Sequence, residues 1–135
     1  MMQDIPFRGW TFYDYFEGGT NCLEAWIASL SMSVKDNVRS KLNSMLIPLQ
    51  QMPPGKWPEQ WISAYKGRDD IYELKFRLKR VQFRPFGCYG PGRYGFTLLG
   101  GAIEQGDMIS EGVLTTLEAR MRSVTMRTVQ EHRYD

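Results

Sequence analysis

Residues 71–86 alternate between apolar and polar side chains, which is the period of a β-strand. The apolar set is Tyr72, Leu74, Phe76 and Leu78, and the polar set is Glu73, Lys75, Arg77 and Lys79. Three of these four polar side chains are cations, and Arg84 follows on the next run. A solvated strand face needs polar residues but does not need positive ones. The bias indicates an anionic partner, most commonly a phosphodiester backbone, and the plain alternative is a solvated strand face.

The start of the chain predicts a strand followed by a helix. The run 9–16 is aromatic and roughly alternating, which is typical of a strand. After a glycine-containing turn, Thr20 or Asn21 can cap a short helix over residues 23–30, with Glu24 near its third position.

A second helix follows. Ser33 is expected to cap it, with Asp36 three residues later. Its apolar stripe, at helical spacing, is Val34, Val38, Leu42, Met45, Leu46 and Leu49. Pro48 predicts that this helix ends or bends near Ile47.

The second half of the chain predicts a three-stranded meander and one more helix. In order, we expect a helical turn at 58–61, strands at 70–78, 81–89 and 94–104, and a helix at 111–124. The run 96–103 is nearly all apolar or small, so its strand is expected to be central and covered on both faces. The tail 125–135 is either a frayed end or a short edge strand.

These elements predict a single α+β domain over residues 1–135. An N-terminal helical hairpin would pack on one face of a small antiparallel meander sheet, and a C-terminal helix would complete the fold. The other face of the sheet would be free. Lys75, Arg77 and Arg84 should then project into that free concavity as solvent-facing side chains.

Composition locates the positive charge. The net charge is only +2 over 135 residues, but residues 66–93 carry eight Lys or Arg against three acids, a local charge of +5. Cys22 and Cys88 do not make a disulfide framework, and the single His132 has no partner for a structural zinc. No run reaches the roughly 18 apolar residues of a membrane span, and the N-terminus does not resemble a signal peptide. These features favour a cytoplasmic protein with free thiols and no membrane partner.

Several motifs together resemble the RelE/ParE toxin superfamily, most closely its phage-derived (prophage) branch. They are Ile71–Phe76, Phe83–Phe86, Phe96–Ala102 followed by a polar pair, and Leu23–Ile27 with the two-helix hairpin. The resemblance covers roughly residues 22–122. It implies a RelE-like fold and a cytoplasmic toxin held inactive by a small antitoxin protein. RelE-type members are mRNA interferases that cut messenger RNA on the ribosome without a metal or other cofactor, whereas ParE-type members inhibit DNA gyrase.

The resemblance also assigns candidate residues. Lys75, Arg77 and Arg84 match the cations that hold the scissile phosphate in RelE-type endoribonucleases. Cations positioned in advance stabilise the charge that builds on the phosphate oxygens. An arginine fork can grip two of those oxygens. The neighbouring cations Lys79, Arg80 and Arg93 are candidate RNA-binding residues.

The chain departs from the family pattern after the third strand. Ile103-Glu104-Gln105 stands where nuclease members usually place a basic pair, and Ser110 stands near the position of a tyrosine that some members use. His132 and Tyr134 in the tail are the remaining candidates for acid–base work, and a solvated histidine near a chain end is the plain alternative. Glu104 favours a rival function: a non-enzymatic family member that inhibits gyrase, or a catalytically degenerate prophage protein that binds a partner. A phage assembly factor that meets an acidic protein is a more distant hypothesis.

The remaining features have plainer interpretations. The tryptophans and the aromatic residues of 10–16 could stack on bases but are expected mainly to pack in the core, with Trp57 and Trp61 the most open to the stacking role. The glycine-rich run 90–95 lacks the Lys-Ser/Thr ending of a phosphate loop and predicts a hairpin connection. Cys88 has no neighbouring histidine in the sequence that would activate it as a nucleophile.

Overall fold

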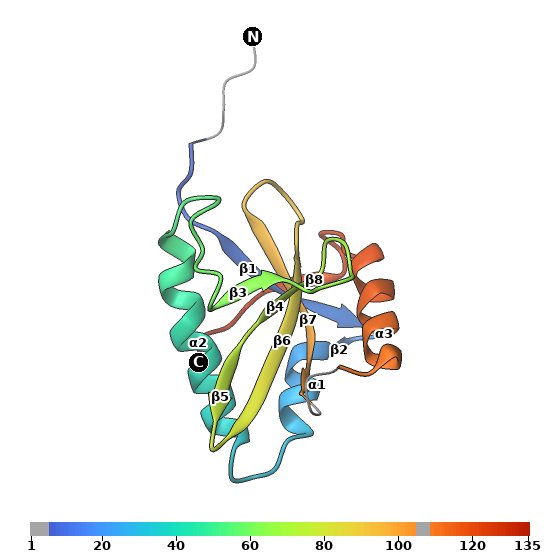
Figure 1. Cartoon of the computed structure of the whole chain (residues 1–135). Coiled ribbons are helices and arrows are strands. Elements are labelled where there is room, and N and C mark those ends of the chain that lie inside the picture. Colours follow the sequence, from blue (N-terminus) through green and yellow to red (C-terminus); the bar gives the residue numbers. More distant parts are fainter. Residues whose placement is uncertain (1–5, 105–108) are drawn as a thin grey trace.

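Within residues 6–104 and 109–135, the part of the chain that the structure describes, a computed structural model shows eight strands in one sheet and three helices (Figure 1). The strands are β1 (Thr11–Glu17), β2 (Thr20–Asn21), β3 (Ile62–Ala64), β4 (Tyr72–Leu74), β5 (Phe76–Leu78), β6 (Val81–Tyr89), β7 (Gly95–Ile103) and β8 (Val129–Glu131). The helices are α1 (Cys22–Ala28), α2 (Lys35–Gln51) and α3 (Glu111–Arg122). The class is α+β, as expected.

The sheet is large and mixed, so the prediction of a RelE-like fold, with a helical hairpin on a small antiparallel meander, is wrong. The strand order is β2-β1-β7-β6-β4-β3, with β5 on β6 and β8 on β1. β1 runs parallel to β7, with Phe12 opposite Phe96, while the other pairs are antiparallel. Parallel neighbours need a long crossover connection. The connection between β1 and β7 runs through most of the chain, and no local period in the sequence predicts that these two strands pair.

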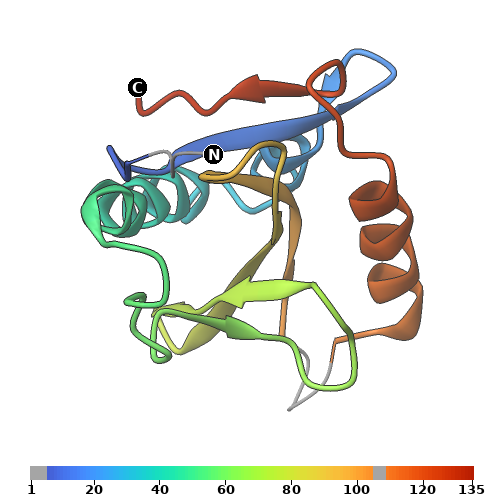
Figure 2. The same ribbon diagram turned by 90° about the horizontal axis from the view of Figure 1, so that it is seen from above.

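Helices cover both faces of the sheet, so the face that was expected to be free is covered. Figure 2 shows α2 and α3 on opposite sides of the curved sheet. The stripe of α2 joins Phe12, Phe83 and Phe96 in one core cluster. Leu114 and Leu117 of α3 join a second cluster with Phe86 and Leu99. A helix with an apolar stripe must bury it, and the second sheet face offers the surface to do so.

The sequence predicted the N-cap of α1 correctly and that of α2 wrongly. Asn21 caps α1, as predicted, because its Oδ1 accepts a hydrogen bond of 3.0 Å from the backbone N–H of Glu24. The predicted Ser33 cap of α2 is wrong. The helix begins at Lys35 after an uncapped Val34, and the Ser33 hydroxyl lies 3.1 Å from that of Ser31.

Of the two outcomes predicted from Pro48, the helix does not end near Ile47, because it continues to Gln51. Contacts from other elements hold this last turn. The backbone N–H of Trp10 donates to the carbonyl of Gln50 at 2.8 Å, and the indole of Trp57 donates to the carbonyl of Leu49 at 2.9 Å. These bonds satisfy carbonyls at the helix end and offset the cost of an internal proline.

The β-strands of the second half match their predicted ranges closely, apart from a break at Lys75 that divides the first into β4 and β5. Lys79 and Arg80 form the tight turn, with φ of 49° and 68°. β7 is buried along most of its length, which confirms that it is central. The tail forms the edge strand β8, and residues 62–64, which carried no strand prediction, form β3.

Candidate functional site

A hollow of about 270 Å³ lies between α2 and the β5 end of the sheet. α2 lines it with Lys41, Ser44 and Met45, and the sheet side lines it with Trp61, Lys75, Phe76 and Arg77. Three of these side chains are cations and none is a carboxylate. The hollow therefore presents positive charge to solvent, together with an indole and a hydroxyl.

The strand break and the hairpin turn position the cations of this region. Lys75 lies at the break between β4 and β5, and its Nζ donates to Ser63 Oγ of β3 at 2.9 Å. Arg77 is exposed, and its Nε donates to Gln82 Oε1 across the hairpin at 3.3 Å. Lys79 and Arg80 form the turn itself, where both have positive φ, and both side chains are exposed.

We call the cations of this region the hairpin cations: Lys41, Lys75, Arg77, Lys79 and Arg80. None of them forms an ion pair with a carboxylate anywhere in residues 6–104 or 109–135. Lys41 was missed by the sequence analysis, because a lysine on the polar side of an amphipathic helix looks like any solvated residue. Its only sequence signal is its spacing from Ser44 on the same side of α2.

Arg84 does not join the hairpin cations. Its Nη1 lies 2.6 Å from Glu73 Oε2 and its Nη2 lies 2.8 Å from Glu104 Oε1. The side chains of Arg84, Glu73 and Glu104 are only 17%, 9% and 14% exposed. Burial works against the charged guanidinium, but the hydrogen bonds to both carboxylates outweigh it and raise the pKa of Arg84 above its ordinary value.

The expected convergence of three cations is thus found for Lys75 and Arg77 only. Two carboxylates against one guanidinium leave a net negative charge around Arg84, which opposes the approach of a phosphate. The sequence identified Glu104 as an acid at an unfavourable position. It did not identify Glu73 as a partner of Arg84, because Glu73 belongs to the same alternating polar set as Lys75 and Arg77.

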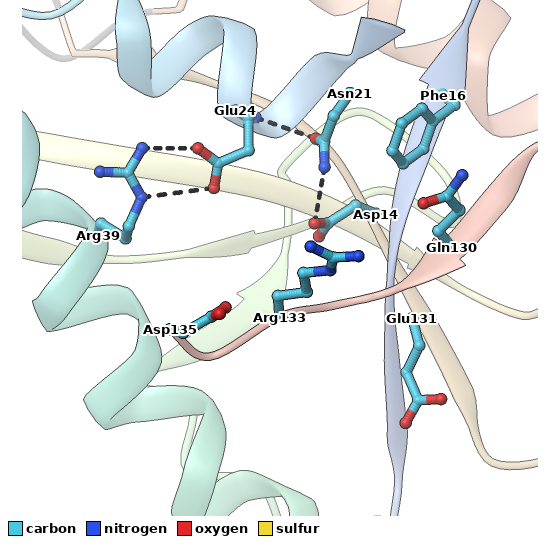
Figure 3. Close-up of a pocket in the computed structure, with 9 residues that line it drawn as sticks. All are labelled: Asp14, Phe16, Asn21, Glu24, Arg39, Gln130, Glu131, Arg133 and Asp135. Atoms are coloured by element: carbon cyan, nitrogen blue, oxygen red, sulfur yellow. Dashed lines mark hydrogen bonds and ion pairs between the residues drawn. The ribbon is translucent and has the colours of Figure 1, made fainter. Parts of the chain in front are cut away.

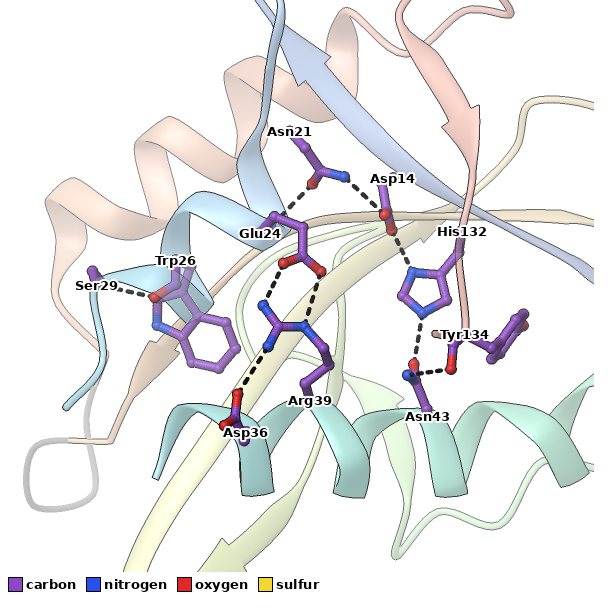
Figure 4. A network of polar contacts seen from close by, with 10 residues as sticks. All are labelled: Asp14, Asn21, Glu24, Trp26, Ser29, Asp36, Arg39, Asn43, His132 and Tyr134. Carbon is purple, nitrogen blue, oxygen red and sulfur yellow. Dashed lines mark hydrogen bonds and ion pairs between the residues drawn. The ribbon is translucent and has the colours of Figure 1, made fainter. Parts of the chain in front are cut away.

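His132 lies at the centre of a buried polar network between β1, α2 and the tail (Figure 4). Its Nδ1 is 2.8 Å from Asp14 Oδ1 and its Nε2 is 2.7 Å from Asn43 Oδ1. Asn43 is oriented by its own Nδ2, which donates to the carbonyl of Tyr134 at 3.3 Å. Both ring nitrogens therefore have a hydrogen-bond partner, and the two contacts fix the orientation of the ring.

This placement bears on the proposed acid–base role of the tail. The His132 side chain is only 2% exposed, and both of its nitrogens are already engaged, so the network fastens the tail to the domain. The Tyr134 ring packs edge-on to His132 with ring centroids 4.9 Å apart. Burial, aided by the charges of Asp14 and Glu131, raises the pKa of Tyr134 to about 12. The Tyr134 hydroxyl therefore keeps its proton near neutral pH, and both His132 nitrogens are occupied by hydrogen bonds within the fold.

The tail candidates also lie far from Arg84 in the sheet. β8 pairs with β1, β1 with β7, and β7 with β6, so three strand spacings separate His132 from Arg84. At the usual spacing this is about 14 Å. The structure therefore does not bring His132 or Tyr134 together with the three cations that were expected to bind a phosphate.

A polar pocket of about 400 Å³ opens beside the tail (Figure 3). Its lining mixes acids and bases: Asp14, Glu24, Arg39, Glu131, Arg133 and Asp135, with Phe16, Asn21 and Gln130. Most of the inner groups are paired. Arg39 Nη2 lies 2.6 Å from Glu24 Oε2, and Asn21 Nδ2 donates to Asp14 Oδ2 at 2.9 Å. These pairs organise the start of α1 against α2 and leave no single charge sign for a ligand.

Arg93, the last candidate RNA-binding residue, lies in the loop between β6 and β7. Its guanidinium is 5.7 Å from the centroid of the Tyr94 ring. This loop and the Lys79-Arg80 turn are at opposite ends of the nine-residue strand β6, about 30 Å apart at 3.3 Å per residue. Arg93 therefore does not extend the group of hairpin cations.

No protein-family model matches this chain, and no curated protein matches it either. The RelE/ParE resemblance accordingly rests on the sequence motifs alone. In the part of the chain that the structure describes, no helix combines the length and apolar character needed to cross a bilayer.

Proposed function

We propose that this protein binds a nucleic acid through the hairpin cations without cleaving it. The proposal shares the lack of catalysis with the alternative raised by the sequence, a gyrase inhibitor or a degenerate prophage protein that binds a partner, and differs from it in taking a nucleic acid as the partner. One observation supports it above all: five cations around one hairpin have no carboxylate partner in residues 6–104 and 109–135, while Arg84 has two. Other cations, such as Lys56 and Arg127, are also exposed, but they lie apart from one another in the sequence and neither lines the hollow beside α2. The hairpin cations are distinguished by their grouping around one hairpin and the adjoining hollow.

Electrostatics favours a polyanion as this partner. Lys75, Arg77 and Lys79 follow one another at intervals of two residues, about 7 Å along a strand, so the fields of neighbouring cations overlap within the Debye length of about 8 Å at physiological ionic strength. Nucleic-acid binding draws much of its affinity from such cations, because each phosphate contact releases condensed counterions. An acidic protein segment offers fewer charges per length and is the competing partner that the experiment must distinguish.

The environment of the expected catalytic groups supports binding without cleavage. A phosphate-cleaving site needs cations aimed at the reacting oxygens and a proton donor within hydrogen-bond reach. Arg84 is held by Glu73 and Glu104, and His132 is enclosed on another part of the sheet. These contacts support binding over catalysis.

The test measures the affinity of the protein for RNA and checks whether the RNA stays intact. Purified protein is titrated into labelled RNA, binding is followed by fluorescence anisotropy, and the RNA is then sized on a gel. We expect saturable binding and full-length RNA. Arg77→Ala with Lys79→Ala should weaken binding at least tenfold. Lys56→Ala with Arg127→Ala, which removes the same charge from exposed sites elsewhere, should change it less than threefold. Equal loss in both double variants, or tighter binding to an acidic peptide, would refute the proposal.

RelE-type, ribosome-dependent mRNA cleavage under the control of an antitoxin is the second candidate. Lys75 and Arg77 favour it, because both line one solvent-accessible hollow. Its test is expression of the chain in growing cells followed by primer extension on cellular messages. Growth arrest with codon-phased breaks, both relieved by Lys75→Ala with Arg77→Ala, would support this candidate over binding alone.

A further inference from the structure

Trp61 differs from the other three tryptophans of this chain. Trp10, Trp26 and Trp57 each pack against at least one other aromatic ring. The Trp10 and Trp57 indoles also donate to backbone carbonyls at 2.9 Å. Trp61 makes no ring contact and no side-chain hydrogen bond with any residue in 6–104 or 109–135. It is half-buried against the core and lines the cationic hollow.

The surroundings of Trp61 suit a flat group attached to a negative charge. The backbone N–H of Lys75 donates to the Trp61 carbonyl at 3.0 Å, so the two residues are neighbours across the β3–β4 pair, and both side chains line the hollow. Lys41 and Arg77 line the same hollow, and Ser44 adds a hydroxyl. The volume of about 270 Å³ is slightly below the range of drug-sized pockets, roughly 300–1,000 Å³. The hollow can thus accept one such group rather than a larger ligand.

We infer that the hollow binds one unpaired nucleobase stacked on Trp61, with the adjoining phosphates on Lys41, Lys75 and Arg77. This inference rests on the proposed function and adds to it a selectivity for single strands. A duplex stacks its bases on one another and leaves no base face open for the indole, so its phosphates can use the hairpin cations but its bases cannot stack on Trp61. Aromatic stacking of this kind is sequence-tolerant, because every base has a π-face.

The inference is tested by comparing single-stranded RNA with a duplex of the same sequence at one salt concentration. Wild-type protein should bind the single strand at least tenfold more tightly, and the single strand should quench tryptophan fluorescence. Trp61→Ala should weaken single-strand binding by about tenfold and leave duplex binding unchanged, since stacking on an aromatic side chain contributes on this scale. Trp61→Phe should retain most of the affinity and lose the quenching.

The possible results separate the two proposals. Equal affinity of wild-type protein for both forms, or no effect of Trp61→Ala on the single strand, overturns base stacking while the hairpin cations remain the binding surface. Loss of both ligands in Trp61→Ala with an unchanged unfolding curve also overturns it, because the indole would then not discriminate between them. Failure of wild-type protein to bind either form overturns both proposals.

Discussion

Arg84 Nη2 and Glu104 Oε1 lie 2.8 Å apart, in an ion pair whose two side chains are both largely buried. Glu104 follows the end of β7, at a position where the RelE/ParE pattern leads one to expect a base. The Glu104 carboxylate thus binds one terminal nitrogen of the Arg84 guanidinium, and the Glu73 carboxylate binds the other. Arg84 serves as a link between β4, β6 and the end of β7, which changes what its removal should do.

Arg84→Ala should destabilise the fold. It would leave the Glu73 and Glu104 carboxylates close together and without a counter-charge, at a cost of about 3 kcal/mol. The matched control is Arg77→Ala on the exposed part of the hairpin, which should change the free energy of unfolding by less than about 0.5 kcal/mol. Urea unfolding measures both. Equal stabilities would mean that Arg84 faces solvent, as the alternating pattern alone suggested.

His132→Ala should also destabilise the protein, and the effect should be strongest in the tail. The change leaves Asp14 and Asn43 without their donor in a buried site, at a cost of about 2–4 kcal/mol. Hydrogen exchange should show early opening of the β8 amides and of the amide at position 132, which donates to the Phe12 carbonyl at 2.8 Å. The exposed neighbour Arg133→Ala is the control. Native-like protection of the β8 amides in His132→Ala would contradict the claim that the His132 network fastens the tail to the domain.

Cys88 should make stability fall with pH in the alkaline range. Burial, aided by the charge of Asp70, raises the pKa of its thiol from 9.0 to about 12. Between these values the unfolded chain releases the proton and the folded chain keeps it, so stability is present below pH 9 and is lost as pH rises toward 12. The contribution is up to about 1.4 kcal/mol per pH unit. Between about pH 9 and pH 11, the free energy of unfolding measured in urea should fall less steeply with pH for Cys88→Ala than for the wild-type protein. Identical slopes in the two proteins would contradict this assignment.

Local patterns in the sequence predict much of this fold. The stripe of α2 and the runs that form β6 and β7 are long enough to show their periods, and Asn21 shows its capping role by its distance from Glu24. The short strands β3 and β8 have three residues each and therefore no readable period. The parallel pairing of β1 with β7 depends on packing between distant segments. The sequence could not show on which face of the sheet α3 would lie.

Only part of the candidate site could be predicted, because its remaining contacts also depend on packing between distant segments. Alternation correctly placed Arg77 in solvent, but it treated every polar position on the strand as equivalent. Glu73 and Arg84 pair across two strands, and that pairing depends on a register that a single sequence does not reveal. Lys41 comes to the hollow from α2, and only the packing of α2 beside β5 brings it there.

The salt dependence of RNA binding tests the central claim most directly. The logarithm of the binding constant should fall linearly with the logarithm of salt concentration, with a slope set by the number of phosphates that the protein contacts. Arg77→Ala with Lys79→Ala removes two hairpin cations and should make this slope shallower by about 1.4, at about 0.7 per contact on a single strand. Lys56→Ala with Arg127→Ala should leave the slope at the wild-type value. The same slope in all three proteins would contradict binding through the hairpin cations.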